Sequence, residues 1–202
     1  LSLTASAING LRRDALASLT AARTAVPQRR ELPVPALPDL DCREEAPAYT
    51  LSLSAASQLS ESLMELGPAR VCLPLEELAA MSALPKGDTE WCAVLPRVWR
   101  DRDETQLRQM LDLVKALGVT GVLIGNIGHL SLARDSGLAM YGDYGLNVFN
   151  SRSLDYLRQK GLASACVSFE LRFAQIRDLQ KVLPTEAIVY GRLPLMLTEN
   201  CL

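Results

Sequence analysis

The residues of this chain that could do chemistry gather in its second half, each group directly after an apolar run. They include amides, hydroxyls, carboxylates, an imidazole and a guanidinium. A carboxylate can move a proton or polarise a water molecule, and a guanidinium can stabilise negative charge that develops during a reaction. The candidate catalytic residues are Glu170, Asn147, Arg192 and Asp143, and the candidate substrate-binding residues are Asn126, His129, Asn150 and Ser168.

Glu170 and Arg192 fall on neighbouring predicted strands with compatible side-chain parity. We therefore expect an ion pair between them, in which the guanidinium keeps the carboxyl ionised. Such a pair could bind substrate or could be a structural bridge inside the fold, and the sequence leaves both interpretations open. Asp143 and Glu170 together could polarise a water molecule.

His129 is the only histidine of the chain, and it follows the glycine-containing loop 125–128 where a predicted helix begins. General acid–base catalysis by its imidazole is one interpretation. A histidine that packs or caps in a loop is the more common case, because no serine or cysteine nucleophile stands beside it in sequence. The loop matches neither a P-loop nor a dinucleotide-binding fingerprint.

Five cysteines stand at positions 42, 72, 92, 166 and 201, without a Cys-x-x-Cys pair. This usage is typical of reduced thiols, and with one histidine it gives no recognisable zinc site. Cys72, Cys92 and Cys166 fall on predicted strands, where free cysteines are commonly buried. Iron–sulfur clusters usually need four thiolates, so Cys201 alone is not a cluster site but could be the first of several ligands.

From Tyr49 onward, short apolar runs alternate with amphipathic stretches, a pattern that predicts βαβ units and a parallel sheet. Strands are expected at 49–55, 69–74, 91–96, 121–126, 139–149, 164–170 and 186–193, and helices at 56–66, 75–82, 103–117, 129–136, 151–160 and 172–182. Seven strands favour an α/β fold with a TIM-barrel-like (β/α) repeat. The barrel is expected to be compact or incomplete, because a full one has eight strands in ~250 residues. An open, doubly wound sheet is the alternative.

Side-chain parity favours the barrel. In the sixth predicted strand Ala165 and Val167 share one face, whereas Ser164, Cys166 and Ser168 share the other. In an α/β protein the apolar face packs against helices. The small and polar face must then line an interior, which a barrel provides. Polar residues at the carboxyl ends of the strands would lie at its mouth, where such folds bind ligands.

The first 48 residues have a different character. A helix is expected over 6–24, with Ser6 as its N-cap and an apolar face made by Ile8, Leu11, Ala15, Leu16, Leu19 and Ala22. Five prolines then predict an extended linker. The expected organisation is an N-terminal helical arm at 1–26, a proline-rich linker at 27–48 and a TIM-barrel-like domain at 49–202.

Composition limits the classes of function. The 202 residues are 49% hydrophobic and carry a net charge of −2, so no overall basic field attracts nucleic acid. No apolar run approaches a membrane span and no signal peptide is visible, so we expect a cytoplasmic protein without a membrane partner. The chain begins at Leu1 without methionine. We interpret it as a fragment whose expected partners are the remaining domains of a longer protein.

Residues 117–130, Leu-Gly-Val-Thr-Gly-Val-Leu-Ile-Gly-Asn-Ile-Gly-His-Leu, resemble the collagenase-like peptidase family, peptidase family U-32. The similarity continues in order through 142–151, Gly161, 168–171, 189–196 and Cys201. Residues 6–13 are similar to the junction that precedes a second barrel segment in long members of the family. The stretch between this junction and the main match is less similar.

The resemblance implies a TIM-barrel-like fold and a peptidase activity. Other members are similar to oxygen-independent hydroxylation factors for ribosomal RNA, transfer RNA or ubiquinone precursors, which hold a [4Fe–4S] cluster through cysteines. Cys201 matches the position of such a cysteine, with further ligands expected beyond Leu202. By this resemblance the fragment itself holds no cofactor, whereas the full-length protein could hold the cluster.

Two positions depart from the family pattern: Tyr190 and Pro194 stand where short members tend to carry His and Cys. The chain also lacks a Ser-His-Asp order, an HExxH motif and a reactive Cys–His pair. Three functions therefore stay open: a peptidase acting on peptides, an RNA-hydroxylating domain, and a non-catalytic barrel that binds substrate or supports its parent chain. We expect the fragment alone to be inactive.

Overall fold

The computed structural model describes residues 4–36, 46–194 and 196–198 of the chain. The chain divides into two compact units, Leu1–Ala36 and Leu37–Leu202, and each is described by itself. The division falls within the stretch predicted to be a linker. Of the described helices, none is long and apolar enough to cross a membrane.

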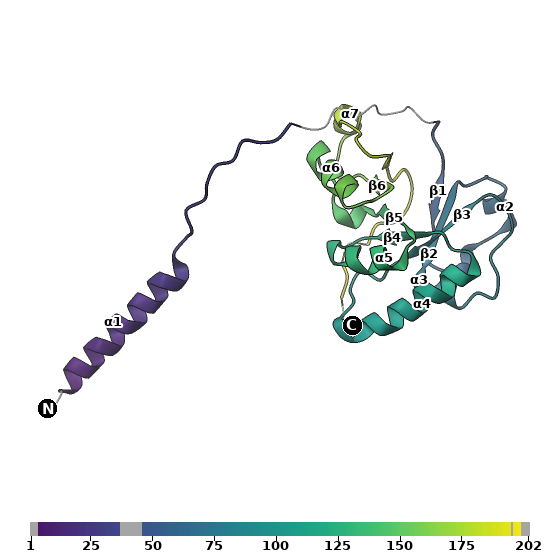
Figure 1. The fold of residues 1–202 in the computed structure, drawn as a ribbon. Helices are drawn as coiled ribbons and strands as arrows, with labels where there is room; N and C mark the ends of the chain where they lie inside the picture. Colours follow the sequence, from purple (N-terminus) through teal and green to yellow (C-terminus); the bar gives the residue numbers. More distant parts are fainter. Residues whose placement is uncertain (1–3, 37–45, 195, 199–202) are drawn as a thin grey trace. The chain divides into compact units, whose positions relative to one another are not determined.

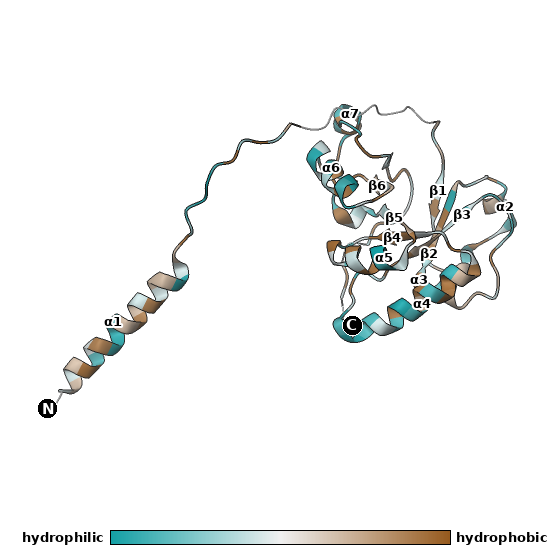
Figure 2. Cartoon of the chain, viewed as in Figure 1, coloured by the Kyte–Doolittle hydropathy of each residue, from teal (hydrophilic) through white to brown (hydrophobic). Residues whose placement is uncertain are grey.

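The first unit is built on one helix, α1 (Ala5–Thr24). Its N-cap is Thr4, whose Oγ1 accepts a hydrogen bond from the Ala7 amide at 3.3 Å. The predicted N-cap, Ser6, instead lies in the first turn, because the helix begins one residue earlier than the apolar periodicity indicates. The helix buries no residue, and large apolar side chains such as Leu11 remain exposed. Brown and teal residues alternate along it in Figure 2.

The second unit contains a seven-stranded sheet in which every strand is parallel to its neighbours (Figure 1). The strands pair in sequence order: β1 (Thr50–Ser52), β2 (Arg70–Pro74), β3 (Glu90–Val94), β4 (Gly121–Ile124), β5 (Ala139–Gly142), β6 (Ser164–Cys166) and β7 (Thr185–Glu186). A doubly wound sheet reverses its strand order at a switch point. This sheet has no reversal, so its winding is that of a TIM-like barrel.

Helices and short 3-10 turns connect the strands. They are η1 (Ala56–Gln58), α2 (Glu61–Met64), α3 (Leu75–Ala79), η2 (Asp101–Asp103), α4 (Glu104–Leu117), η3 (Ile127–His129), α5 (Leu130–Ser136), η4 (Tyr144–Leu146), α6 (Ser151–Gln159) and α7 (Phe173–Asp178). The longest of them in this unit, α4, buries Leu107, Leu111 and Val114 on one face. It ends at Gly118, whose φ of 108° lies in the left-handed region that glycine tolerates.

The two faces of the sheet differ, and the face that packs against the helices is apolar, as the parity of the sequence predicts. Outward residues such as Val71, Ala165 and Val167 belong to the large core shared with the helices. Inward residues form a separate small cluster of Cys72, Cys92, Leu123 and Tyr141. This alternation follows from the period of two along a strand.

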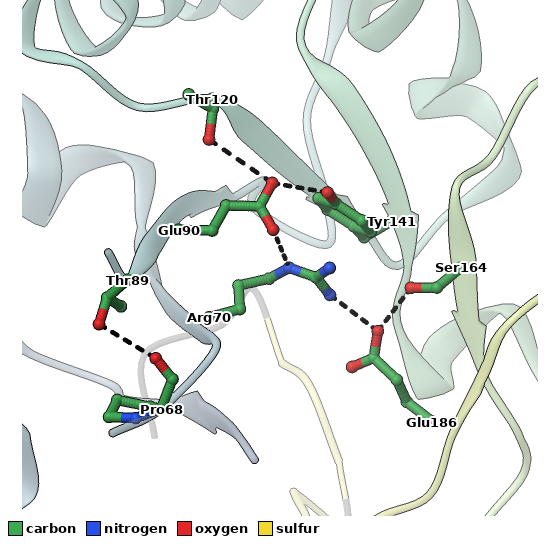
Figure 3. Close-up of polar contacts among 8 residues, drawn as sticks. All are labelled: Pro68, Arg70, Thr89, Glu90, Thr120, Tyr141, Ser164 and Glu186. Carbon is green, nitrogen blue, oxygen red and sulfur yellow. Dashed lines mark hydrogen bonds and ion pairs between the residues drawn. The ribbon is translucent and has the colours of Figure 1, made fainter. Parts of the chain in front are cut away.

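A charged network across the interior shows that the sheet is curled (Figure 3). In sheet order β2 and β7 lie five steps apart, which in a flat sheet would separate them by about 24 Å. Instead, Arg70 Nη1 on β2 lies 2.8 Å from Glu186 Oε1 on β7, and its Nε lies 2.9 Å from Glu90 Oε2 on β3. Arg70 also stacks on the ring of Tyr141, 3.4 Å from its centroid. The domain is therefore a TIM-barrel-like α/β fold, curled but incomplete in its described part.

Several strands are shorter than the sequence predicts, and the fifth and the seventh differ most. The strand expected over 139–149 ends at Gly142, because Asp143 caps η4 and Asn147 adopts a left-handed φ of 49°. The strand expected over 186–193 is limited to Thr185–Glu186. Beyond it the backbone has no ladder partner among the described residues, and Val189 is 87% exposed.

Candidate functional site at the carboxyl ends of the strands

A guanidinium, a carboxyl and a phenol meet at the carboxyl end of the sheet. Arg97 follows β3, and Asp143 and Tyr144 follow β5. Arg97 Nη2 lies 3.7 Å from Asp143 Oδ2, and the guanidinium carbon lies 4.4 Å from the centroid of the Tyr144 ring. Asn126, which follows β4, donates from Nδ2 to the Arg97 carbonyl at 3.4 Å. The loops after β3 and β5 thus build one cluster, which we call the Arg97–Asp143 cluster (Arg97, Asp143 and Tyr144), and Asn126 joins the loop after β4 to it.

Two glycines let the loops after β4 and β5 approach this closely. A Cβ on Gly145 would lie 2.6 Å from the Gly125 carbonyl oxygen, which real Cβ atoms do not do. A Cβ on Gly125 would lie 3.3 Å from Asp143 Oδ2. The absence of side chains at these positions leaves room for the Asp143 carboxyl beside the Gly125 backbone.

The environment of Asp143 makes its carboxyl a better proton acceptor than an ordinary aspartate. Burial raises its pKa above the usual value. The Tyr144 amide, which donates to Oδ1 at 2.8 Å, and the Arg97 charge oppose this rise but do not cancel it. Arg97 Nη2 is itself buried and has no hydrogen-bond partner among the described residues. The cluster therefore offers both a basic carboxyl and an unused donor.

Cys166 lies on β6, where the charges of Asp143 and Glu186 reach it. Burial raises the pKa of the Cys166 thiol to about 12, and the two carboxylates add to the rise. A thiol becomes a nucleophile as its thiolate. Cys166 is consequently a protonated, buried residue of the interior, in agreement with the core role predicted for it.

An aromatic ring lies at the rim of the cluster. Phe169 packs edge-on against Tyr144, with ring centroids 6.0 Å apart, and is 52% exposed. Ser168 beside it is buried, and its Oγ accepts from the Glu170 amide at 3.4 Å. The hydroxyl of Ser168 therefore supports the turn that follows β6.

The expected ion pair between Glu170 and Arg192 does not form. Both residues are described and exposed, and no ion pair joins them. The prediction assumed strands over 164–170 and 186–193. Because both strands end early, the side-chain parity that would bring the two residues together is lost.

The remaining predicted residues have separate positions. Asn150 caps α6, its Oδ1 accepting from the Ser153 amide at 2.9 Å. Asn147 is exposed at the left-handed turn after η4. His129 is fully buried. Cys201 lies outside the described residues. Of the candidates, the structure places Asp143 in the cluster and Asn126 against its main chain.

Sequence reasoning missed Arg97 and Tyr144. Arg97 follows the third predicted strand, over 91–96, at the same carboxyl edge as the residues that were selected. Applying the carboxyl-end rule to that strand as well would have found it. Tyr144 was not selected because the fifth strand was expected to continue past it.

No iron–sulfur site is found among the described residues, and the predicted ligand Cys201 lies outside them. Among them, no group of three or more His, Cys, Asp or Glu side chains is placed to hold a metal ion. The three described cysteines, Cys72, Cys92 and Cys166, are all buried in the interior of the sheet.

The model of peptidase family U32 matches residues 70–202, well over half of the chain. The chain belongs to peptidase family U32. The U32 match contains the whole Arg97–Asp143 cluster and begins at Arg70, the first residue of β2.

One solved structure supports the fold of this U32 domain. The structure of the U32 peptidase Mk0906 is similar with a TM-score of 0.51 and 13% identity, covering 75% of this chain and 71% of that one. A putative deoxyribose-phosphate aldolase from Coccidioides immitis is a weaker match, with a TM-score of 0.40 and 14% identity over 86% of this chain and 82% of that one. No curated protein matches the sequence significantly.

Proposed function

We propose that this U32 domain hydrolyses peptide bonds at the Arg97–Asp143 cluster. Asp143 acts as the acid–base group and Arg97 stabilises the oxyanion. The observation that carries the proposal is the pairing, at the carboxyl end of the sheet, of a desolvated carboxyl with a half-buried guanidinium. The buried Nη2 of that guanidinium lies 3.7 Å from the carboxyl and makes no hydrogen bond among the described residues. That end is where enzymes with parallel (β/α) barrels place their chemistry.

In the proposed reaction the Asp143 carboxylate accepts a proton from a water molecule, whose oxygen attacks the substrate carbonyl carbon. The carbonyl oxygen takes up the displaced electron pair and becomes an oxyanion, which Arg97 Nη2 binds. As the C–N bond breaks, the protonated Asp143 gives its proton to the leaving amine. One water molecule is consumed, and Asp143 returns to its starting state.

The first test is hydrolysis of a fluorescence-quenched peptide library by the intact protein that carries this chain. Asp143→Asn removes the proton acceptor and is expected to lower kcat/KM on the order of 10²–10⁴-fold. Arg97→Met is expected to lower kcat on the order of 10²–10³-fold, as loss of an oxyanion donor does. Matched controls are Asp135→Asn and Arg108→Met, which break an exposed ion pair of the same type.

The pH profile provides a second readout. Asp143 must be ionised to accept a proton, so kcat/KM falls as the pH drops through its pKa. Because burial raises that pKa, the acid limb lies above the ordinary aspartate value of 3.8. An unshifted acid limb, or equal activity of Asp143→Asn and the wild type, would refute the role of Asp143.

If no peptide is cleaved, the two other functions are tested on the same protein. Anaerobic purification followed by measurement of iron and acid-labile sulfide per chain tests redox modification of RNA by a [4Fe–4S] enzyme, with Cys201→Ala as the informative variant. A protein with neither hydrolysis nor bound iron would be a substrate-binding or supporting barrel.

A further inference from the structure

His129 is buried next to the loop that carries Arg97. Its side chain has no exposed surface, although it is polar and titratable. Neither ring nitrogen has a hydrogen-bond partner among the described residues. Buried polar atoms are normally paired, so a buried imidazole without a hydrogen-bond partner needs a physical explanation.

The loop after β3 and the loop after β4 enclose this ring. The Trp99 ring lies on the first loop, with its centroid 6.4 Å from that of His129. The Pro96 backbone also lies near the ring, because it partly offsets the lowering of the His129 pKa, although it forms no hydrogen bond with the ring here. The same two loops are joined again by the bond from Asn126 to the Arg97 carbonyl. The position of the 96–99 segment, which carries Arg97, therefore depends on the His129 ring that it packs against.

We propose that His129 is a positioning residue for the reaction at Arg97: its neutral ring supports the 96–99 segment and directs an N–H group to the Pro96 carbonyl, which holds Arg97 facing Asp143. This inference rests on the proposed peptidase function. Hydrogen bonds of this kind are often long in ligand-free proteins and shorten when substrate binds.

The ring is neutral because of where it is buried. Burial lowers its pKa below the ordinary 6.5, and the Pro96 backbone opposes this only in part. Charged side chains stand on both elements next to the ring: Arg97 and Arg100 on the loop after β3, and Arg134 and Asp135 on α5. None of them is a cause of the lowered pKa of His129. Protonation consequently favours expulsion of the ring, and Arg97 then loses its support.

Fluorescence tests this placement without any assay of activity. The chain has two tryptophans, so Trp91→Phe leaves Trp99 as the only reporter, and His129 is the only imidazole. We expect a change in Trp99 emission with a midpoint below pH 6.5, absent when His129→Phe is added. An emission change that persists with His129→Phe, or a midpoint at or above 6.5, would overturn the buried placement.

Kinetics tests the positioning role. His129→Leu keeps an apolar volume but removes the N–H, and we expect kcat to fall roughly tenfold with little change in KM, equivalent to roughly 1.4 kcal/mol of lost transition-state stabilisation. His129→Gln keeps a side-chain N–H and should restore most of kcat. Leu132→Ala, on the buried face of α5, controls for loss of stability alone.

Amide hydrogen exchange separates failure of this inference from failure of the proposed function. His129→Leu is expected to speed exchange at Arg97 and Val98, whereas Leu132→Ala should not do so selectively. If the wild type cleaves no peptide but exchange and fluorescence behave as expected, the peptidase proposal fails and the support of the loop by His129 stands. If the wild type is active and His129→Leu matches it in kcat and in exchange, the inference is wrong.

Discussion

Gly145 shows how one missing side chain shapes the candidate site. Its Cα approaches the Gly125 backbone so closely that any Cβ would fall 2.6 Å from the carbonyl oxygen. Backbone cannot move aside as a flexible side chain can. The close approach holds η4 against the loop after β4, and η4 carries Tyr144 of the Arg97–Asp143 cluster.

Gly145→Ala is therefore expected to lower the free energy of unfolding by about 1–3 kcal/mol, in the range of overpacked sites, and to displace Tyr144 from Arg97. Urea denaturation measures the loss. Gly128→Ala is the matched control, because its Cβ would meet only the Asn126 side chain, at 3.4 Å. Equal stability of the two variants would show that the contact relaxes without cost.

At the scale of elements, η4 interrupts what the alternating sequence presents as one long strand. Asp143 caps it through the Tyr144 amide, and it ends at Asn147 with φ 49°. Asn147 is the only described residue other than glycine with a positive φ. Asparagine tolerates this region better than most residues. After the turn the chain rejoins the sheet through the bridge between Val148 and Val167.

Asn147→Ala is expected to cost about 1 kcal/mol of unfolding free energy, because alanine pays the full penalty of the left-handed region. Asn147→Gly should lie within about 0.5 kcal/mol of the wild type, because glycine adopts this φ freely but is more flexible when unfolded. Thermal and urea unfolding measure both. A glycine variant as unstable as the alanine variant would place the cost in the lost Asn147 side chain instead of the backbone.

At the scale of the whole domain, Arg70 ties β2 to three other strands of the curled sheet. It pairs with Glu90 and Glu186 and stacks on Tyr141, whose hydroxyl donates to Glu90 at 2.6 Å. Burial and the Glu90 carboxylate raise the pKa of Tyr141 to about 12, so it remains a donor at neutral pH. Ser164 adds a further hydrogen bond to Glu186.

Arg70→Met is expected to lower the free energy of unfolding by about 2–3 kcal/mol, less than for a fully buried pair because the two glutamate side chains keep some exposure. Hydrogen exchange should rise first at β7, which the arginine holds to β2. Arg108→Met, which breaks exposed ion pairs, should not change the unfolding midpoint detectably. Unaltered exchange at β7 would show that the curl does not depend on Arg70.

Local patterns in the sequence account for the order of strands and helices in this protein. Periodicity predicts the alternation of strands and helices, the amphipathic α4 and the two faces of β6, because these depend on side chains a few residues apart. It also brought Asp143 to the carboxyl edge. Cys166 was recognised as an interior residue for the same reason.

Which side chains meet across the fold depends on the tertiary structure. The Arg70–Glu186 contact joins residues that the strand order separates by most of the sheet, and no local pattern reports curvature. The predicted pairing of Glu170 with Arg192 relied on side-chain parity along two strands, and it fails because both strands end early. Arg97, in contrast, contacts Asp143 from a loop 46 positions earlier in the chain. A strand ends where it has no neighbouring strand to hydrogen-bond with, or where a capping residue such as Asp143 begins another element. Both conditions depend on the complete tertiary structure.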